Sequence, residues 1–210
     1  SDSVKWEDAA LVEPFAIGSH CTGRGRVVED DVVFILGTGT IGSIILQTCK
    51  AKGCKTVICC DISDSSLERA KEYGADYVIN SKTQDVVAEI QKITDGHGCT
   101  VAFDSACFPG SLTMCLQPGI LCNAGRMVPM GFCTEKEGIT QAMINQRELD
   151  IIGSRMSQDA FEPTIARMEK GEYITEGIAT TFIKFSDIDK VFYLMDHPDE
   201  SAKKMVILFD

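Results

Sequence analysis

Short apolar runs alternate with amphipathic stretches of helical period through most of the chain. The run Val32–Leu36 has five apolar residues without a polar interruption, which is typical of a strand buried on both faces of a parallel sheet. Further strands are predicted over residues 56–60, 77–79, 100–103, 126–130 and 148–152. This alternation predicts an α/β fold, namely a doubly wound, parallel, six-stranded Rossmann sheet with right-handed crossovers.

The stretches between the strands have helical patterns. Either Ser63 or Asp64 is suited to cap a helix that follows the second strand. Residues 108–123 predict a helix interrupted by a Pro-Gly pair, and residues 7–21 predict one that Pro14 bends or restarts. The other helices are predicted over residues 44–51, 65–73, 85–94 and 139–145.

The last fifty residues differ in character from the rest. They predict a helix over residues 161–170, an extended segment over 180–185, a helix capped at Ser186 and a final strand over 204–209.

The first predicted strand runs directly into the sequence Gly-Thr-Gly-Thr-Ile-Gly. In this pattern the first glycine permits a tight turn, the second lets the backbone approach a pyrophosphate, and the third lets the next helix pack close to the sheet. The N-terminus of that helix presents free N–H groups and a partial positive charge to the phosphates. The loop residues expected to bind a dinucleotide are Gly37, Gly39, Thr40, Ile41 and Gly42.

Asp61 lies nineteen residues beyond Gly42, at the end of the second predicted strand. A carboxylate at this position can accept both ribose hydroxyls of the adenosine half, and Ile62 beside it is expected to contact the same part of the cofactor. The carboxylate also repels a 2′-phosphate, which predicts NAD rather than NADP. The alternative at this point is another Rossmann-like nucleotide binder, such as a methyltransferase.

The charge of the chain limits its partners. Asp and Glu number 31 against 20 Lys and Arg, which gives a net charge of −11. Nucleic acids and anionic membranes are bound through basic surfaces, so we expect neither as a partner. The sequence has no apolar run close to the length of a membrane span, and residues 1–5 do not resemble a signal peptide.

The ten cysteines form no Cys-x-x-Cys pair, and several fall inside predicted strands or helices. Buried free thiols in a reducing compartment explain this distribution better than a disulfide framework does. The sequence therefore predicts a soluble cytoplasmic protein.

Five separate stretches of the chain, in the same order, carry a resemblance to a known family. They are the Ala-Leu-Val-Glu-Pro-Phe-Ala-Ile segment at 10–17, the Asp-Ile-Ser-Asp to Gly-Ala-Asp segment at 61–76, Gly-Arg-Met-Val-Pro-Met-Gly at 125–131, Glu-Leu-Asp-Ile-Ile-Gly-Ser-Arg at 148–155 and Lys-Lys-Met-Val-Ile-Leu at 203–208. From about residue 9 to residue 210, the chain resembles the zinc-dependent medium-chain dehydrogenases of the sorbitol, L-idonate and L-galactonate type.

The resemblance implies a division of the chain and a metal. Residues 24–178 would form the NAD-binding Rossmann domain, residues 1–23 a linker helix from a mostly absent GroES-like catalytic domain, and residues 179–210 the return to that domain. In the family this domain carries the cysteine and histidine ligands of a catalytic zinc. Glu13 would then be a catalytic residue that reaches the zinc directly or through water, and without the other ligands the chain is expected to hold no zinc.

The carboxyl ends of the later strands supply further candidates, because ligands of doubly wound sheets lie outside these ends. The pairs after the fourth and fifth strands are placed to meet the nicotinamide ribose and carboxamide. By resemblance, the pair after the sixth strand lies near the nicotinamide or its pyrophosphate, although its arginine could instead form a surface salt bridge. These pairs are Ser105 and Ala106, Met130 and Gly131, and Ser154 and Arg155.

The resemblance implies an oxidoreductase that transfers hydride between a secondary alcohol, a polyol or a sugar acid, and NAD. The isolated coenzyme-binding part is expected to be nearly inert. Family members associate through the outer edge of the coenzyme sheet, so we expect a homodimer or homotetramer that uses residues 142–152. The alternatives are a stand-alone NAD-sensing domain without catalysis and the methyltransferase.

Overall fold

A computed structural model of the chain describes residues 4–197 and 204–209. The predicted terminal segments 1–23 and 179–210 therefore lie partly outside the described residues. Residues 1–5, which do not resemble a signal peptide, are described only from residue 4 onward. In the described part of the chain, no helix combines the length and hydrophobicity needed to cross a membrane.

Six parallel strands form one sheet in the order β3-β2-β1-β4-β5-β6. This is the strand order of two mononucleotide-binding halves that meet between β1 and β4, so the predicted Rossmann sheet is confirmed. The strands are β1 Val32–Leu36, β2 Thr56–Asp61, β3 Tyr77–Asn80, β4 Cys99–Asp104, β5 Leu121–Pro129 and β6 Asp150–Ile151.

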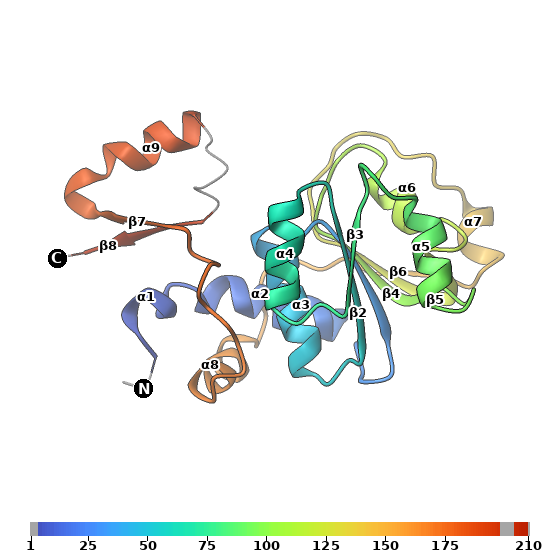
Figure 1. The fold of residues 1–210 in the computed structure, drawn as a ribbon, viewed down its shortest axis with the longest axis horizontal. Helices are drawn as coiled ribbons and strands as arrows, with labels where there is room; N and C mark the ends of the chain where they lie inside the picture. Colours follow the sequence, from blue (N-terminus) through green and yellow to red (C-terminus); the bar gives the residue numbers. More distant parts are fainter. Residues whose placement is uncertain (1–3, 198–203, 210) are drawn as a thin grey trace.

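Helices cover both faces of this sheet (Figure 1). Successive side chains of a strand point to opposite faces, so Val33 and Ile35 enter one buried cluster while Phe34 and Leu36 enter another. The helices are α1 Trp6–Ala9, α2 Val12–Arg24, α3 Thr40–Ala51, α4 Asp64–Glu72, α5 Val86–Ile93, α6 Ser111–Cys115, α7 Gln141–Asn145 and α8 Phe161–Glu169.

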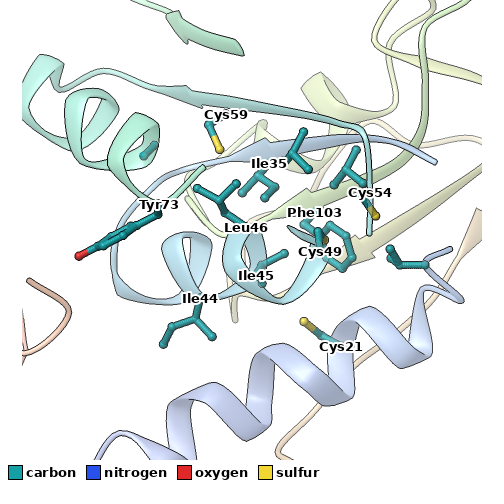
Figure 2. Close-up of a cluster of buried hydrophobic side chains, with 14 of the residues drawn as sticks. Cys21, Ile35, Ile44, Ile45, Leu46, Cys49, Cys54, Cys59, Tyr73 and Phe103 are labelled. Carbon is teal, nitrogen blue, oxygen red and sulfur yellow. The ribbon is translucent and has the colours of Figure 1, made fainter. Parts of the chain in front are cut away.

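The first cluster lies between the sheet and helices α2, α3 and α4. Figure 2 shows its apolar side chains from α3, such as Ile45 and Leu46, packed with thiols from several elements. All ten cysteines belong to the described part of the chain and are free, and seven of them are buried. These small apolar side chains fill the core as other small hydrophobic residues would.

Two predicted helices differ from the structure. Helix α6 is short, and the chain from Leu121 onward is strand β5 rather than helix, because Gly119 adopts a φ of +95° and Leu121 then pairs with Cys99. Ser186 caps no helix, since it lies inside a 3-10 turn, Phe185–Asp187, that leads into α9 Asp189–Asp196. At the other end of the chain, the predicted restart is observed: α2 begins at Val12, with Pro14 in its first turn, where a missing N–H costs little.

The C-terminal segment forms a separate small unit. Strands β7 Thr181–Lys184 and β8 Met205–Leu208 pair in parallel, and α9 belongs to the connection between them. In Figure 1 this unit lies to one side of the six-stranded sheet.

Candidate dinucleotide-binding site

The turn after β1 depends on its first glycine. Gly37 has a φ of +88°, which favours glycine, and its N–H donates to the carbonyl oxygen of Cys60 at 2.7 Å. A Cβ at this position would lie 2.8 Å from the backbone nitrogen of Ala106. The turn is therefore held closely against the carboxyl ends of both neighbouring strands, β2 and β4.

The other two glycines of the loop have different surroundings. A Cβ on Gly42 would lie 1.9 Å from the carbonyl oxygen of Gly37, so only glycine lets α3 start this close to the turn. Gly39 caps the same helix, and no heavy atom lies within 4 Å of the position a Cβ would take. The backbone at Gly39 is thus accessible at the N-terminus of α3, where Thr40 and Ile41 form the first turn with free N–H groups.

Asp61 ends β2 beside this turn, and the donors around its carboxylate come from two loops. Its Oδ2 accepts from the backbone N–H of Thr38 at 2.7 Å and from the Thr38 hydroxyl at 2.9 Å. Its Oδ1 accepts from the N–H of Ile62 at 2.7 Å and from the N–H of Ser63 at 3.0 Å. The carboxylate is therefore fixed in orientation next to the glycine-rich turn, and the Ile62 side chain beside it is exposed.

The ends of β4 and β5 lie next to the same turn. The N–H of Ser105 donates to the backbone carbonyl oxygen of Leu36 at the end of β1. The N–H of Met130 donates to the backbone carbonyl oxygen of Asp104 at the end of β4. Ser105 Oγ is buried and has no hydrogen-bond partner. A Cβ on Gly131 would lie 2.0 Å from Cys107 Sγ, so the thiol packs directly on this glycine, whereas Ala106 is exposed.

The segment after β6 contributes a second unpaired hydroxyl. Ser154 Oγ is buried without a hydrogen-bond partner, as Ser105 Oγ is. The guanidinium carbon of the exposed Arg155 lies 5.3 Å from the centre of the Phe132 ring, a cation–π distance. Arg155 therefore contacts an aromatic ring, and no salt bridge is observed for it among the described residues.

These observations test whether the residues present fit a dinucleotide. A buried hydroxyl without a partner is costly, and a ligand that pairs with it removes the cost. Both unpaired serine hydroxyls follow sheet strands at the carboxyl edge, and the space at Gly39 is open at the same edge. The chain therefore offers an exposed helix N-terminus for phosphates, a carboxylate beside it for a ribose and hydroxyls for further polar contacts, which is the set of groups that a dinucleotide requires.

Sequence reasoning missed two features of this region. Thr38 was not among the candidates, although a hydroxyl residue between the first two glycines is the signal that could have identified it. The segment around residues 174–177 also approaches the loop from a distant part of the chain. Gln47 makes two hydrogen bonds to the backbone of Ile174, and the Tyr73 hydroxyl donates to the carbonyl oxygen of Glu176 at 2.8 Å.

A cavity of about 300 Å³ lies at the ends of β4 and β5, and two of the three carboxylates that line it, those of Asp104 and Glu137, are already used in structural hydrogen bonds. Asp104 accepts from Ser111 Oγ at 2.5 Å, and Glu137 accepts from the N–H groups of Gly110 and Thr113. Burial acts to raise the pKa of Glu137, but the hydrogen bonds from Thr113 and Gly110 outweigh it and leave this pKa below its ordinary value. Both carboxylates therefore hold the loops that form the cavity.

Glu13 lies on α2, whereas the other candidates lie at the ends of the sheet strands, on the loops that follow them or at the start of α3. It is exposed in the first turn of α2, and the hollow of about 450 Å³ near that helix is lined by His20 and Arg24, not by Glu13. Within residues 4–197 and 204–209, no group of three or more His, Cys, Asp or Glu side chains could hold a metal ion. The described donors thus do not fit a zinc site by themselves.

Comparisons with known proteins agree with this architecture. Residues 40–170 match the family model described as zinc-binding dehydrogenase. The starvation-sensing protein RspB of Escherichia coli (strain K12) is 33% identical over 210 residues, which cover 99% of this chain and 60% of RspB. Sorbitol dehydrogenase of Bacillus subtilis (strain 168) is 31% identical over 181 residues, which cover 86% of this chain and 49% of that enzyme.

A solved structure is similar in three dimensions. It is the crystal structure of a short chain alcohol dehydrogenase (rspB) from E. coli CFT073 complexed with NADH, with a TM-score of 0.88 and 31% identity. The alignment covers 100% of this chain and 60% of that one. The chain thus spans 60% or less of the length of these relatives. The match to a dehydrogenase family model does not favour the methyltransferase or sensor alternatives.

Proposed function

Because this chain belongs to the zinc-binding dehydrogenase family, we propose that it forms the coenzyme-binding region of an NAD-dependent alcohol dehydrogenase. The substrate class would be a small secondary alcohol, either a polyol or a sugar acid. The observation that carries the proposal is the edge of the sheet where the glycine-rich turn, the Asp61 carboxylate and the unpaired Ser105 hydroxyl lie beside adjacent strands. The similar E. coli protein crystallised with NADH supports it.

Each part of this edge has a role in the proposal. The N–H groups at the start of α3 receive the diphosphate over Gly39, where no side chain intervenes. Asp61 accepts ribose hydroxyls, and the Ser105 and Ser154 hydroxyls gain partners toward the nicotinamide half. NAD, when bound, supplies the hydride acceptor, and the residues of the chain fix its orientation.

We propose that residues 1–23 and 179–210 pack against a catalytic domain beyond the described residues. Support comes from β7, β8 and α9, a two-stranded unit with large apolar side chains in contact with solvent, among them Phe182, Phe192 and Tyr193. A two-stranded sheet is marginally stable alone and needs other structure packed against its apolar surface. Under this proposal Glu13, from α2, faces the catalytic zinc only when that domain is present, and substrate turnover requires both domains.

The outer edge of the sheet is the proposed site of self-association. β6 is one of the two edge strands of the sheet, and Ile151 on it is exposed. An exposed edge strand readily pairs with another copy of itself, so we expect a homodimer or homotetramer, and sedimentation velocity would measure it. We place the protein in the cytoplasm, for which the seven buried free thiols are the support.

Direct titration tests the proposal. We expect saturable binding of NADH. The fluorescence of NADH itself, which increases on binding, is the signal to measure, because Trp6 is 90% exposed on α1 and a poor reporter. Asp61→Ala should weaken NADH binding and reduce the difference between the affinities for NADH and NADPH, since the ribose loses its acceptor. Saturable binding of S-adenosylmethionine, with none of NADH, would contradict the proposal.

A further inference from the structure

The acceptor capacity of Asp61 is already filled by the protein. An ionised carboxylate has about four lone-pair positions, and each Asp61 oxygen accepts two hydrogen bonds. A ribose hydroxyl that binds to this carboxylate must therefore take the place of one of these donors.

The four donors differ in their freedom to move. Three are backbone N–H groups, from Thr38, Ile62 and Ser63, and their directions are fixed by the glycine-rich turn and by the start of α4. The carbonyl of Thr38 is fixed as well, because it accepts from Ser43 Oγ at 3.0 Å. The Thr38 hydroxyl is the one donor of the four that can turn away by rotation of a side-chain bond.

We propose that the Thr38 hydroxyl occupies the position on Asp61 that an adenosine ribose hydroxyl takes, so that Thr38 sets coenzyme affinity and selectivity; this rests on the proposed function. The distance of 2.9 Å from Thr38 Oγ1 to Asp61 Oδ2 is within the range of a formed O–H···O hydrogen bond. Thr38 is only 2% exposed, so water does not compete strongly for its hydroxyl.

Two consequences follow for the coenzymes. NADH binding loses the hydrogen bond between Thr38 and Asp61 when the ribose displaces the hydroxyl, so the apparent affinity is reduced. A 2′-phosphate on NADPH is repelled by the carboxylate, and the Thr38 donor partly offsets this negative charge. Thr38 therefore lowers affinity for NADH and narrows the selectivity for NADH over NADPH.

The test compares three chains that differ at position 38. Thr38→Val keeps the branched shape and removes the hydroxyl, whereas Thr38→Ser keeps the hydroxyl. We expect Thr38→Val to bind NADH about fivefold more tightly than the wild type, the effect of one hydrogen bond, without tighter NADPH binding. Thr38→Ser should bind NADH with the affinity of the wild type. The double variant Asp61→Ala, Thr38→Val should bind NADH with the same affinity as Asp61→Ala alone.

The outcomes separate this inference from the proposed function. If the wild type binds NADH and Thr38→Val binds it equally or more weakly, the hydroxyl orders the carboxylate instead of competing with ribose, and the inference is overturned alone. If the wild type shows no saturable NADH binding, both are overturned. Thr38→Ala removes the same hydroxyl and gives the same comparison if Thr38→Val does not fold.

Discussion

The six-stranded sheet and the C-terminal β7–α9–β8 unit share a pattern but differ in burial. In both, parallel strands are joined by a connection that contains a helix. Phe34 in β1 is 0% exposed, whereas Phe192 in α9 is 59% exposed and Phe209 after β8 is 75% exposed. The same kind of side chain therefore stabilises one region strongly and contributes little to the other.

The difference lies in the number of layers. The six-stranded sheet has helices on both faces, so alternate residues of each strand are buried in two separate clusters. In the small unit, Ile183, Val191 and Val206 are buried, while large apolar side chains on its other surfaces face solvent. A parallel sheet is normally covered on both sides, so a secondary-structure pattern alone does not define a complete domain.

The largest expected effect compares one phenylalanine from each region. Phe34→Ala should lower the free energy of unfolding by about 3–5 kcal/mol, because it leaves a cavity in a closed core. Phe192→Ala should change it by about 0.5 kcal/mol or less, because that side chain is already exposed. Urea unfolding followed by circular dichroism measures both, and equal losses would contradict the contrast.

A smaller effect is expected from two glycine substitutions. Gly42→Ala puts a methyl group 1.9 Å from the carbonyl oxygen of Gly37, so α3 must shift, at a cost of about 1–3 kcal/mol. Gly138→Ala is the control, because no heavy atom lies within 4 Å of its Cβ position. Unfolding in urea should separate the two variants, and a fully stable Gly42→Ala would contradict the close packing of the turn.

Alkaline pH should weaken the sheet region, which contains all the buried thiols. Burial raises the pKa of Cys60 from its ordinary 9.0 to about 12. Above pH 9 the unfolded chain loses this proton and the folded chain keeps it. Stability is therefore full below that pH and falls as the pH rises toward 12, by about 1.4 kcal/mol per pH unit for each such thiol.

The control variants for this pH effect are Cys60→Ala and Cys133→Ser. The first should reduce the slope of unfolding free energy against pH above 9, because one buried thiol is lost. The second should leave the slope unchanged, because Cys133 is exposed. Urea unfolding at several pH values measures the slopes, and identical slopes in the wild type and Cys60→Ala would contradict the effect.

The sequence was sufficient to predict the sheet, because uninterrupted apolar runs and the three loop glycines are local signals. Contacts between distant segments were not predictable in this way. The hydrogen bond from Thr38 to Asp61 needs the ends of β1 and β2 to be adjacent, and the change to strand at Leu121 depends on pairing with Cys99. The roles of the cofactor residues remain predictions.

The smallest effect concerns two serines, one in each region: Ser63, which the sequence offered with Asp64 as a possible helix cap, and Ser186, which it predicted as one. Ser63 begins α4 and its Oγ accepts from the N–H of Ser66 at 3.4 Å, whereas Ser186 lies in a 3-10 turn and caps nothing. Ser63→Ala should therefore cost about 0.5–1 kcal/mol of unfolding free energy, at the lower end because the hydrogen bond is long, and Ser186→Ala should cost a few tenths at most. Both are measured by urea unfolding beside the wild type. A loss of unfolding free energy on Ser186→Ala as large as that on Ser63→Ala would mean that the 3-10 turn stabilises the C-terminal unit. The exposed apolar surface of that unit would then limit its stability less than the comparison with the six-stranded sheet indicates.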